Sequence, residues 1–301
     1  MKKIIISGAS GFLGQAIAKH LSNEGYTCLR LVRRKPTGAD EIFWDPYNQE
    51  IDSKSLEGSI AMINLSGESI SGLRWSEAKK QRLHDSRVLT SRFLVDTIET
   101  LTKKPNVFIS ASGIGFYGDQ GDKILDEDDR VGKTFLATLC SKWEEESLKL
   151  SSPQTRSVAI RLGIVLSDKG GVLPAMKLPF SLGLGGRVGN GKQFVSWIDI
   201  VDFLAIISHL LIDSSLSGAI NVCSPKPIQN IELTKALGRA LNRPTIFPLP
   251  AFVVKSVLGE MGEALLLNST RAIPRKLEKS GFSFQYSDIL DSLKKNFKPL
   301  G

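Results

Sequence analysis

Short apolar runs alternate with longer amphipathic segments over the first half of the chain. The first run, residues 4–6, is three isoleucines in a row, which leave no polar face for water and are typical of a strand buried on both sides. Residues 12–23 then carry apolar side chains at helical spacing. The same alternation predicts further helices at 75–101 and 132–150, and further strands at 26–32, 41–44, 60–65, 107–110 and 156–165. This order predicts an α/β fold with a doubly wound parallel sheet and right-handed crossovers.

Glycines at three positions follow the first apolar run directly. Gly8 would allow the sharp turn off the strand, Gly11 would let the backbone approach a pyrophosphate, and Gly14 would let the next helix pack tightly on the sheet. The start of that helix would point free N–H groups and the positive end of its dipole at the phosphates. The pattern therefore predicts a Rossmann-like dinucleotide site, and an ordinary glycine-rich turn is the alternative.

The end of the second predicted strand indicates which dinucleotide would bind. An acidic residue here would hydrogen-bond the ribose 2′-OH of NAD, whereas this chain has Arg33 and Arg34, which suit a 2′-phosphate. NADP is therefore the predicted cofactor, and a surface cluster of arginines is the alternative. A later buried strand ends in Leu65, Ser66 and Gly67, where small residues would allow close backbone approach to the cofactor.

The second half of the chain changes character. Glycines gather between 183 and 191, and glycine-rich loops of this length are usually functional or mobile. We expect residues 170–301 to form a smaller C-terminal α/β substrate lobe over the carboxyl edge of the sheet, including a small domain at about 247–297. Residues 1–169 would form the NADP-binding domain, with its sheet completed by a strand near 219–223.

Composition adds limits to this picture. The 301 residues are 42% hydrophobic and 23% charged, as in ordinary soluble proteins, and no apolar run approaches the roughly 20 residues that span a bilayer. Cys28, Cys140 and Cys223 are far apart and lack metal-ligand spacing, and the 3 histidines also argue against a zinc site. A strand at the N-terminus leaves no room for a cleavable signal. We therefore expect a cytoplasmic protein with neither a metal nor a membrane partner.

The net charge of +8 raises the question of nucleic acid. The basic groups are scattered, and the densest run lies on a predicted helix without interleaved aromatic residues for base stacking. That run consists of Lys79, Lys80, Arg82, Arg87 and Arg92. A solvated helix face is the preferred interpretation, so no nucleic-acid partner is expected. Some of the positive charge would instead serve an anionic cofactor or substrate.

Several motifs together resemble a known family. They are GASGFLG at 8–14, INLSG at 63–67, SASGIGFYGD at 110–119, SKWE at 141–144, RLGIVL at 161–166 and LGLGGRVGNGKQFVSWIDIVD at 182–202. This set resembles the extended short-chain dehydrogenase/reductase superfamily and, within it, the epimerase family proteins, which are similar to nucleoside-diphosphate-sugar epimerases and are sometimes labelled cell-division inhibitors. The resemblance covers essentially the whole chain, including the family's small uncharacterised C-terminal domain.

The resemblance implies a set of cofactor contacts. Pyrophosphate contacts are implied for Ser10, Gly11, Phe12 and Leu13, 2′-phosphate contacts for Arg33 and Arg34, and ribose contacts for Leu65 and Ser66. Two further residues, Arg87 and Val165, match positions near the cofactor in this subgroup. For Arg87 a solvated charge on a long helix is an equal alternative.

The superfamily's chemistry needs a Tyr that exchanges a proton, a Lys four residues later that holds the nicotinamide ribose, and a Ser that hydrogen-bonds the substrate oxygen. The alignment puts Gly113 at the Ser position, Thr138 at the Tyr position and Lys142 at the Lys position. A threonine hydroxyl is a far weaker acid than a phenol, so ordinary proton relay is in doubt. Ser112 could replace the missing Ser. Tyr117 is the nearest phenol, although at this point in the superfamily it normally shapes the substrate pocket.

Two functional hypotheses follow. The first is an NADP-dependent oxidoreductase or epimerase-like enzyme for a small carbonyl or alcohol substrate, with Lys142 on the ribose and Ser112, Tyr117 or water handling the proton. Arg187 or Lys192 of the glycine-rich loop would then meet an anionic group on the substrate. The alternative is a non-catalytic NADP(H)-binding sensor or partner-binding protein, with a link to cell division as one option. Either a monomer or a homodimer is compatible with the sequence.

Overall fold

The computed structural model describes residues 2–72 and 74–297. Within these residues the main sheet has eight strands in the order β13-β8-β6-β5-β1-β2-β3-β4. β4 runs antiparallel to β3, and the other neighbours pair in parallel. The strands are β1 (Lys3–Ser7), β2 (Thr27–Val32), β3 (Glu41–Asp45), β4 (Glu50–Ile51), β5 (Ala61–Asn64), β6 (Val107–Gly113), β8 (Arg156–Leu162) and β13 (Gly218–Val222). The predicted doubly wound sheet is confirmed, and its order reverses between β1 and β5, where such sheets bind ligands.

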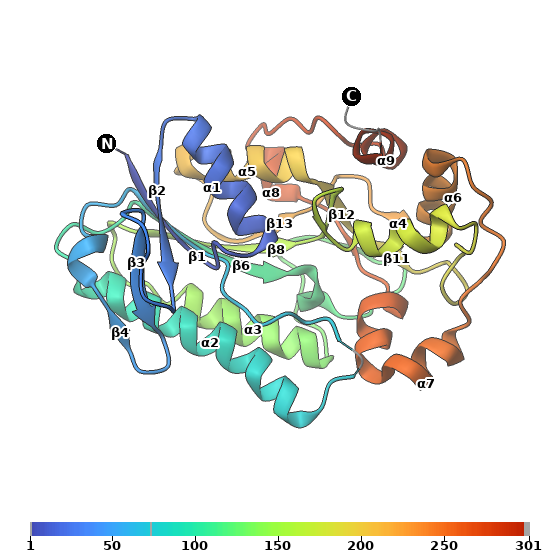
Figure 1. Ribbon diagram of the computed structural model, residues 1–301, viewed down its shortest axis with the longest axis horizontal. Helices are drawn as coiled ribbons and strands as arrows, with labels where there is room; N and C mark the ends of the chain where they lie inside the picture. Colours follow the sequence, from blue (N-terminus) through green and yellow to red (C-terminus); the bar gives the residue numbers. More distant parts are fainter. Residues whose placement is uncertain (1, 73, 298–301) are drawn as a thin grey trace.

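Helices cover both faces of this sheet (Figure 1). One face carries α1 and α5, and the other carries α2 and α3; their bounds are α1 (Phe12–Asn23), α2 (Glu77–Thr100), α3 (Phe135–Ser147) and α5 (Ile200–Ile212). Ile4 and Ile6 of β1 belong to the core cluster that contains Ile17 of α1, whereas Ile5 belongs to the cluster that contains Leu94 of α2. Because side chains alternate along a strand, three adjacent isoleucines fill two separate cores.

The second half of the chain supplies part of the main sheet. β13 pairs with β8 at its outer side, where the sequence predicts the returning strand, and α5 packs against α1. The single strand predicted at 156–165 is divided at Gly163 into β8 and β9 (Ile164–Ser167). A Cβ at Gly163 would lie 2.9 Å from the Ser196 carbonyl oxygen, so the close approach of this neighbouring segment explains the break. β9 instead forms a small sheet with β10 (Gly170–Gly171) and β12 (Trp197–Asp199).

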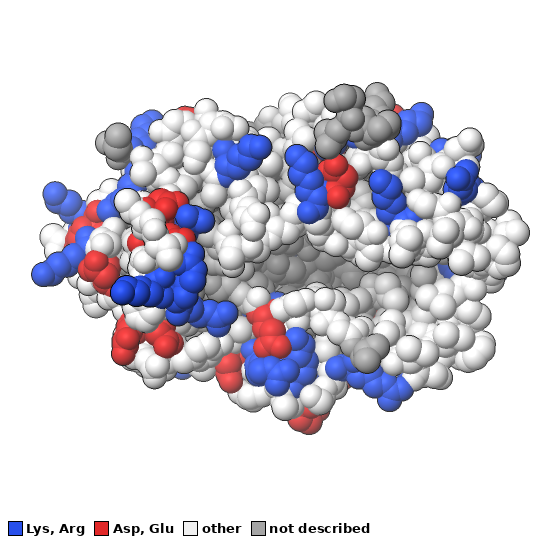
Figure 2. All heavy atoms as spheres, in the orientation of Figure 1, with Lys and Arg blue, Asp and Glu red and all other residues white. Residues whose placement is uncertain are grey.

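The remaining elements gather beyond the carboxyl ends of the parallel strands, at the right of Figure 1. They include α4 (Leu173–Ser181), α6 (Asn230–Leu241), α7 (Ala251–Gly262), α9 (Ile289–Phe297), and the pairs β11 (Phe194–Val195) with β14 (Ile228–Gln229) and β7 (Ile124–Leu125) with β15 (Arg271–Ala272). The short helix α8 (Arg275–Lys279) instead packs on β13 of the main sheet. Short helical turns complete the chain at η1 (Ser53–Leu56), η2 (Ile114–Tyr117) and η3 (Glu263–Leu267). Figure 2 shows that the face viewed is hollowed between this lobe and the sheet.

The glycine-rich loop of the second lobe is tied to the segment that follows α6. Leu249 donates its backbone N–H to the Arg187 carbonyl at 2.8 Å, and Gly189 donates to the Leu249 carbonyl at 2.8 Å. A Cβ at Gly186 would lie 1.9 Å from the Phe247 carbonyl oxygen, so the two backbones are in contact. Glycine is therefore needed at position 186 for packing.

The described residues contain no membrane-spanning helix, no metal-binding cluster and no disulfide. Among them, no helix has both the length and the apolar character needed to pass through a bilayer. The same part of the chain holds no group of three or more His, Cys, Asp or Glu side chains arranged to bind a metal ion. All three cysteines are free thiols.

Candidate functional site

The turn between β1 and α1 is built around close backbone contacts. Gly8 has a φ of +69°, and a Cβ there would lie 2.6 Å from the Leu65 carbonyl oxygen, so glycine is needed both for conformation and for space. A Cβ at Gly14 would lie 2.4 Å from the Gly8 carbonyl oxygen. The start of α1 thus packs directly on the turn, as the sequence predicts for the third glycine.

The N-terminus of α1 lies beside the hollow (Figures 1 and 2). Its N-cap is Gly11 in an extended conformation, and no described side chain caps it. Ser10 and Gly11 are exposed. Phe12 packs against the β9–β10 hairpin, where a Cβ at Gly170 would lie 2.5 Å from its ring, and Val165 belongs to the same core cluster. The uncapped N–H groups and the exposed turn form a site that suits an anion.

Buried hydrogen bonds fix the segment after β5. The Asn64 side chain accepts hydrogen bonds from the Ser7 hydroxyl at 2.7 Å and from the Ser66 backbone N–H at 3.1 Å, and it donates to the Ser91 hydroxyl at 2.9 Å. This network joins β1, β5 and α2 just below the point where the sheet order reverses. Leu65 and Ser66 are therefore held in a defined conformation beside the Gly8 turn.

Arg87 of α2 contacts the segment that follows β5. Its side chain is buried, and its guanidinium donates to the Glu68 carbonyl at 2.9 Å and to the Leu83 carbonyl at 3.2 Å. It lies 5.2 Å from the Trp143 ring centre, and a Cβ at Gly67 would be 3.0 Å from its Cζ. Burial lowers the pKa of Arg87. The alternative of a solvated charge is wrong, and a contact with the cofactor stays a prediction.

The rest of the basic run on α2 is paired with carboxylates. Lys79 and Arg82 both contact Glu68, at 2.6 and 3.2 Å, and ion pairs of 2.7 Å join Lys80 to Glu260 and Arg92 to Glu146. The interpretation of this run as a simple solvated face therefore needs correction. The Lys80 pair ties α2 to α7 in the other lobe.

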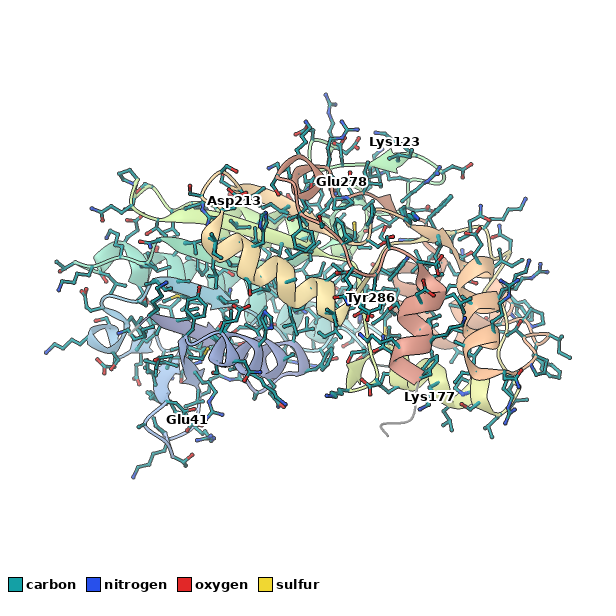
Figure 3. All side chains as sticks on the ribbon, turned by 90° about the horizontal axis from the view of Figure 1, so that it is seen from above. Glu41, Lys123, Lys177, Asp213, Glu278 and Tyr286 are labelled. Carbon is teal, nitrogen blue, oxygen red and sulfur yellow. The ribbon has the colours of Figure 1, made fainter. Side chains whose placement is uncertain are left out.

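The two arginines after β2 have different environments. Arg33 is exposed and makes no hydrogen bond or ion pair within the described part of the chain. Arg34 instead holds the Glu41 carboxylate, and this contact lowers the pKa of Glu41 to about 2. Figure 3 shows Glu41 at the opposite end of the molecule from Lys177 of α4. The end of β2 therefore offers one arginine that Glu41 does not hold, at the place where a 2′-phosphate is expected.

At the end of β6, Ser112 meets α3. The Ser112 hydroxyl donates to Oε1 of Glu144 at 2.6 Å. Cys140, one helical turn earlier, has its sulfur 3.9 Å from the place of a Cβ at Gly113. Burial, followed by the nearby Glu144 carboxylate, raises the pKa of the Cys140 thiol to about 11. The face of α3 that meets the strand end thus carries Cys140 and Glu144, neither of which was identified from the sequence.

The structure does not bring Lys142 to this strand end. Positions two apart on a helix point about 200° apart, so Lys142 lies on the side of α3 away from Cys140 and Glu144. Lys142 and Thr138 are both exposed, whereas Leu136 and Cys140 are buried. The helical spacing of the apolar residues Leu136, Leu139, Cys140 and Trp143 was the sequence signal that could have identified the buried side of α3. A role for Lys142 at the ribose remains a prediction, and this geometry disfavours it.

Tyr117 is enclosed in a buried polar network. Glu144 accepts two hydrogen bonds from Arg161, at 2.9 and 2.8 Å, and Arg161 donates to the Tyr117 hydroxyl at 2.9 Å. The Tyr117 hydroxyl donates to Oδ1 of Asn221 at 2.7 Å. The ring is fully buried, and burial raises the pKa of the phenol well above its ordinary value. The arrangement gives Tyr117 a structural contact and makes proton exchange with a substrate unfavourable.

Comparisons with known proteins show the family of this chain. The model of the NAD dependent epimerase/dehydratase family matches residues 4–223, and a domain of unknown function, DUF1731, matches residues 249–295. Epimerase family protein ML0860 of Mycobacterium leprae is 40% identical over 96% of this chain and 94% of its own length.

Solved structures show the same relationship. Human epimerase family protein SDR39U1, crystallised with NADPH, is 31% identical, with a TM-score of 0.91 over 99% of this chain and 100% of the other. A UDP-glucuronic acid 4-epimerase from Bacillus cereus, solved with UDP-glucuronic acid and NAD, has a TM-score of 0.73 over 98% of this chain and 97% of the other, and at 17% identity it shows the fold alone. As the sequence motifs predict, the chain belongs to the NAD dependent epimerase/dehydratase family.

Proposed function

We propose that the chain binds NADP(H) and acts as an oxidoreductase on a small carbonyl or alcohol substrate. The observation that carries the cofactor assignment is the turn between β1 and α1. Its glycines let the turn pack against the Leu65 carbonyl and let α1 pack on the turn, and the turn presents the uncapped N-terminus of α1 at the point where the sheet order reverses. The residues present therefore fit a dinucleotide.

Each part of the cofactor has a matching group in this chain. The N–H groups at the start of α1, with Ser10 and Leu13, would bind the pyrophosphate. Arg33 would bind the 2′-phosphate, because it is exposed at the end of β2 and Arg34 is occupied by Glu41. Leu65 and Ser66, together with Val165, would border the ribose and nicotinamide end. When bound, NADP(H) supplies or accepts a hydride. The NADPH held by the human relative supports this choice of cofactor.

Ser112 is the residue that we propose for hydrogen bonding to the substrate oxygen. Its proton is directed to Glu144 at 2.6 Å, which leaves its oxygen lone pairs available to accept a hydrogen bond. The hydroxyl of a substrate alcohol would donate to that oxygen; on oxidation its carbon would lose a hydride to the nicotinamide and its oxygen would lose the hydroxyl proton to water. A carbonyl oxygen would accept from Ser112 only if the Ser112 proton turned from Glu144 to the substrate. Ser112 is 5% exposed, so the substrate would need to approach closely along the end of β6.

A non-catalytic NADP(H)-binding protein is the second candidate. The specific observation in its favour is that Tyr117 is buried and Lys142 lies on the outer side of α3. Neither the phenol nor the amine then meets a substrate at the end of β6. This candidate predicts cofactor binding and a response of the second lobe without substrate-dependent oxidation. A role in cell division belongs with this candidate and stays a prediction.

One titration separates these possibilities. NADPH, NADH, NADP and NAD are titrated into the protein, with fluorescence and thermal unfolding as readouts, and the reduced nicotinamide absorbance is then followed with a panel of carbonyl compounds. Selective binding of NADP(H) followed by turnover supports the oxidoreductase. Selective binding with no turnover across the panel supports the second candidate. Failure of all four dinucleotides to bind would overturn both.

A further inference from the structure

Apolar side chains from both lobes meet at the carboxyl ends of β5 and β8. They form one cluster, whose buried members include Trp75 and Met261, from opposite sides of the lobe boundary. Its partly buried members include Leu65, directly after β5, Leu162, the last residue of β8, and Leu265 of η3. The cluster therefore begins at the segment proposed to border the cofactor ribose and continues into the second lobe.

The second lobe contributes to this cluster through an unusual turn. Residues 263–267 form a π-helical turn, closed by a hydrogen bond of 3.0 Å from the Asn268 N–H to the Glu263 carbonyl. Such turns are rare and occur frequently at functional sites. The apolar residues of this turn, Ala264, Leu265, Leu266 and Leu267, are all partly buried, and the first two belong to the cluster.

Further contacts hold the turn in place. Gln193 donates from its side chain to the Leu266 carbonyl at 2.9 Å. A Cβ at Gly189 of the glycine-rich loop would lie 3.2 Å from the Leu267 side chain, so loop and turn are in contact. Glu263, the charged residue of the turn, is exposed and pairs with Lys255 at 2.8 Å. Its charge is therefore turned to solvent and does not add polarity to the leucines.

We propose that Leu265 and its cluster neighbours Leu65 and Leu162 form the substrate-binding wall and that the substrate is a small, apolar ketone, aldehyde or secondary alcohol, an inference that rests on the proposed function. Partly buried leucines cannot replace the water that is hydrogen-bonded to a sugar's hydroxyl groups, so a sugar would be desolvated without compensation, whereas an apolar body gains from the same contact. The hollow in Figure 2 shows no gathering of blue or red side chains within it.

The competing ligand is a nucleotide sugar. Arg187 and Lys192 are exposed on the glycine-rich loop and would be its expected phosphate contacts. The fold-level likeness to the Bacillus cereus epimerase does not decide the question, because fold alone leaves the substrate open. Binding of an apolar ligand should depend on Leu265, whereas binding of a nucleotide sugar should depend on Arg187. Substitutions at these two positions therefore distinguish the two ligand classes.

The test uses the full chain saturated with NADPH. Binding of acetophenone, menthone and UDP-glucose is measured by saturation-transfer NMR for the wild type, Leu265→Asp, Leu265→Ala and Arg187→Ala. The matched control is Ile212→Asp, which changes a residue that is 76% exposed on α5. NADPH affinity and the unfolding midpoint of each variant are measured in parallel, and Leu265→Ala covers the case in which Leu265→Asp fails to fold.

We expect both ketones to bind the wild type and Ile212→Asp equally, and Leu265→Asp to weaken them by about tenfold or more with NADPH affinity unchanged. Leu265→Ala should weaken them less. UDP-glucose binding that depends on Arg187 and survives the changes at Leu265 would overturn the inference, and so would a lack of binding by both ketones. Failure of the wild type to bind NADPH would instead overturn the proposed function.

Discussion

Arg34 and Glu41 form a bidentate ion pair beyond the end of β2, with hydrogen bonds of 2.8 and 2.6 Å from the two Nη atoms to the two carboxylate oxygens. Glu41 also accepts the Thr37 backbone N–H at 2.8 Å. The pair closes the loop between β2 and β3. It also makes two adjacent arginines, which look equivalent in the sequence, into residues with different roles.

Replacing the two arginines should therefore have different effects. Arg33→Ala should weaken NADPH by about 10- to 100-fold and leave NADH unchanged, because it removes a charged hydrogen bond to the 2′-phosphate alone. Arg34→Ala should lower the unfolding midpoint, since Glu41 loses its bidentate partner and keeps only the longer contact with Arg30 at 3.3 Å. Fluorescence titrations with both nucleotides and thermal unfolding measure the two effects. Equal losses of NADPH and NADH affinity in Arg33→Ala would contradict the assignment.

The Glu41 carboxyl should make stability depend on acid pH. Its pKa is lowered from 4.5 to about 2, chiefly by Arg34, so the charged form stabilises the folded chain above about pH 4.5. This contribution is lost as the pH falls from about 4.5 to about 2. Glu41→Gln lacks the titrating group, and its stability deficit relative to wild type should shrink over that range. Urea unfolding across this range measures the difference, and a constant deficit would argue against the pair.

Gly14→Ala should destabilise the chain even though alanine favours helices. The added Cβ would meet the Gly8 carbonyl oxygen at 2.4 Å, so the start of α1 must move away from the turn. We expect a loss of about 1–3 kcal/mol in the free energy of unfolding, together with weaker NADPH binding. Gly72→Ala is the matched control, because a Cβ there meets no atom within 4 Å. Unchanged binding in Gly14→Ala would contradict the tight packing of α1.

Removing Glu144 from its buried ion pair with Arg161 should lower the free energy of unfolding more than removing an exposed neighbour of Glu144. Glu144→Ala leaves Arg161 buried without its carboxylate and should lower the free energy of unfolding by about 3–5 kcal/mol. Glu145→Ala changes the next residue, whose side chain is 67% exposed, and should have little effect. A double variant, Glu144→Leu with Arg161→Met, should recover much of the loss. Equal effects of the two single changes would show that the pair is not buried in solution.

Lys142→Met tests the register of α3. The outward position of Lys142 leads us to expect NADPH affinity within about twofold of wild type, as for an ordinary surface change. A contact with the nicotinamide ribose would instead reduce affinity by about tenfold, the effect of one lost charged hydrogen bond. Isothermal titration of NADPH into the two proteins gives the answer directly.

The local pattern of isoleucines and glycines was sufficient to predict the β1–α1 unit. Three adjacent isoleucines require a doubly covered strand, and the role of Gly14 follows from its short contact with Gly8 within the same turn. The contact of Gly8 with Leu65 joins two strands and was not predicted. The returning strand at β13 was also predictable, because an apolar run has few other places in such a fold. These features depend on neighbours in sequence or on general rules of sheet architecture.

The contact between Ser112 and α3 was less predictable, because it depends on which face of α3 turns toward the sheet. Aligning FYGD at 116–119 on the family's pattern puts Thr138 and Lys142 at the Tyr and Lys positions, whereas the folded helix turns Cys140 and Glu144 toward the strand end. The length of the connection before α3 sets the register of this helix, and motif spacing does not reveal it. The partner that holds Glu144 is Arg161 on another element, a contact that only the tertiary structure supplies.

The placement of β13 and α5 has a consequence for biosynthesis. Until residues 200–222 have left the ribosome, the nascent chain has β8 as an unpaired outer strand and α1 without its packing partner. Unpaired strand edges and uncovered apolar faces invite misfolding and association. The nucleotide-binding half of this protein is therefore expected to need chaperone protection during translation, until the second half of the chain completes it.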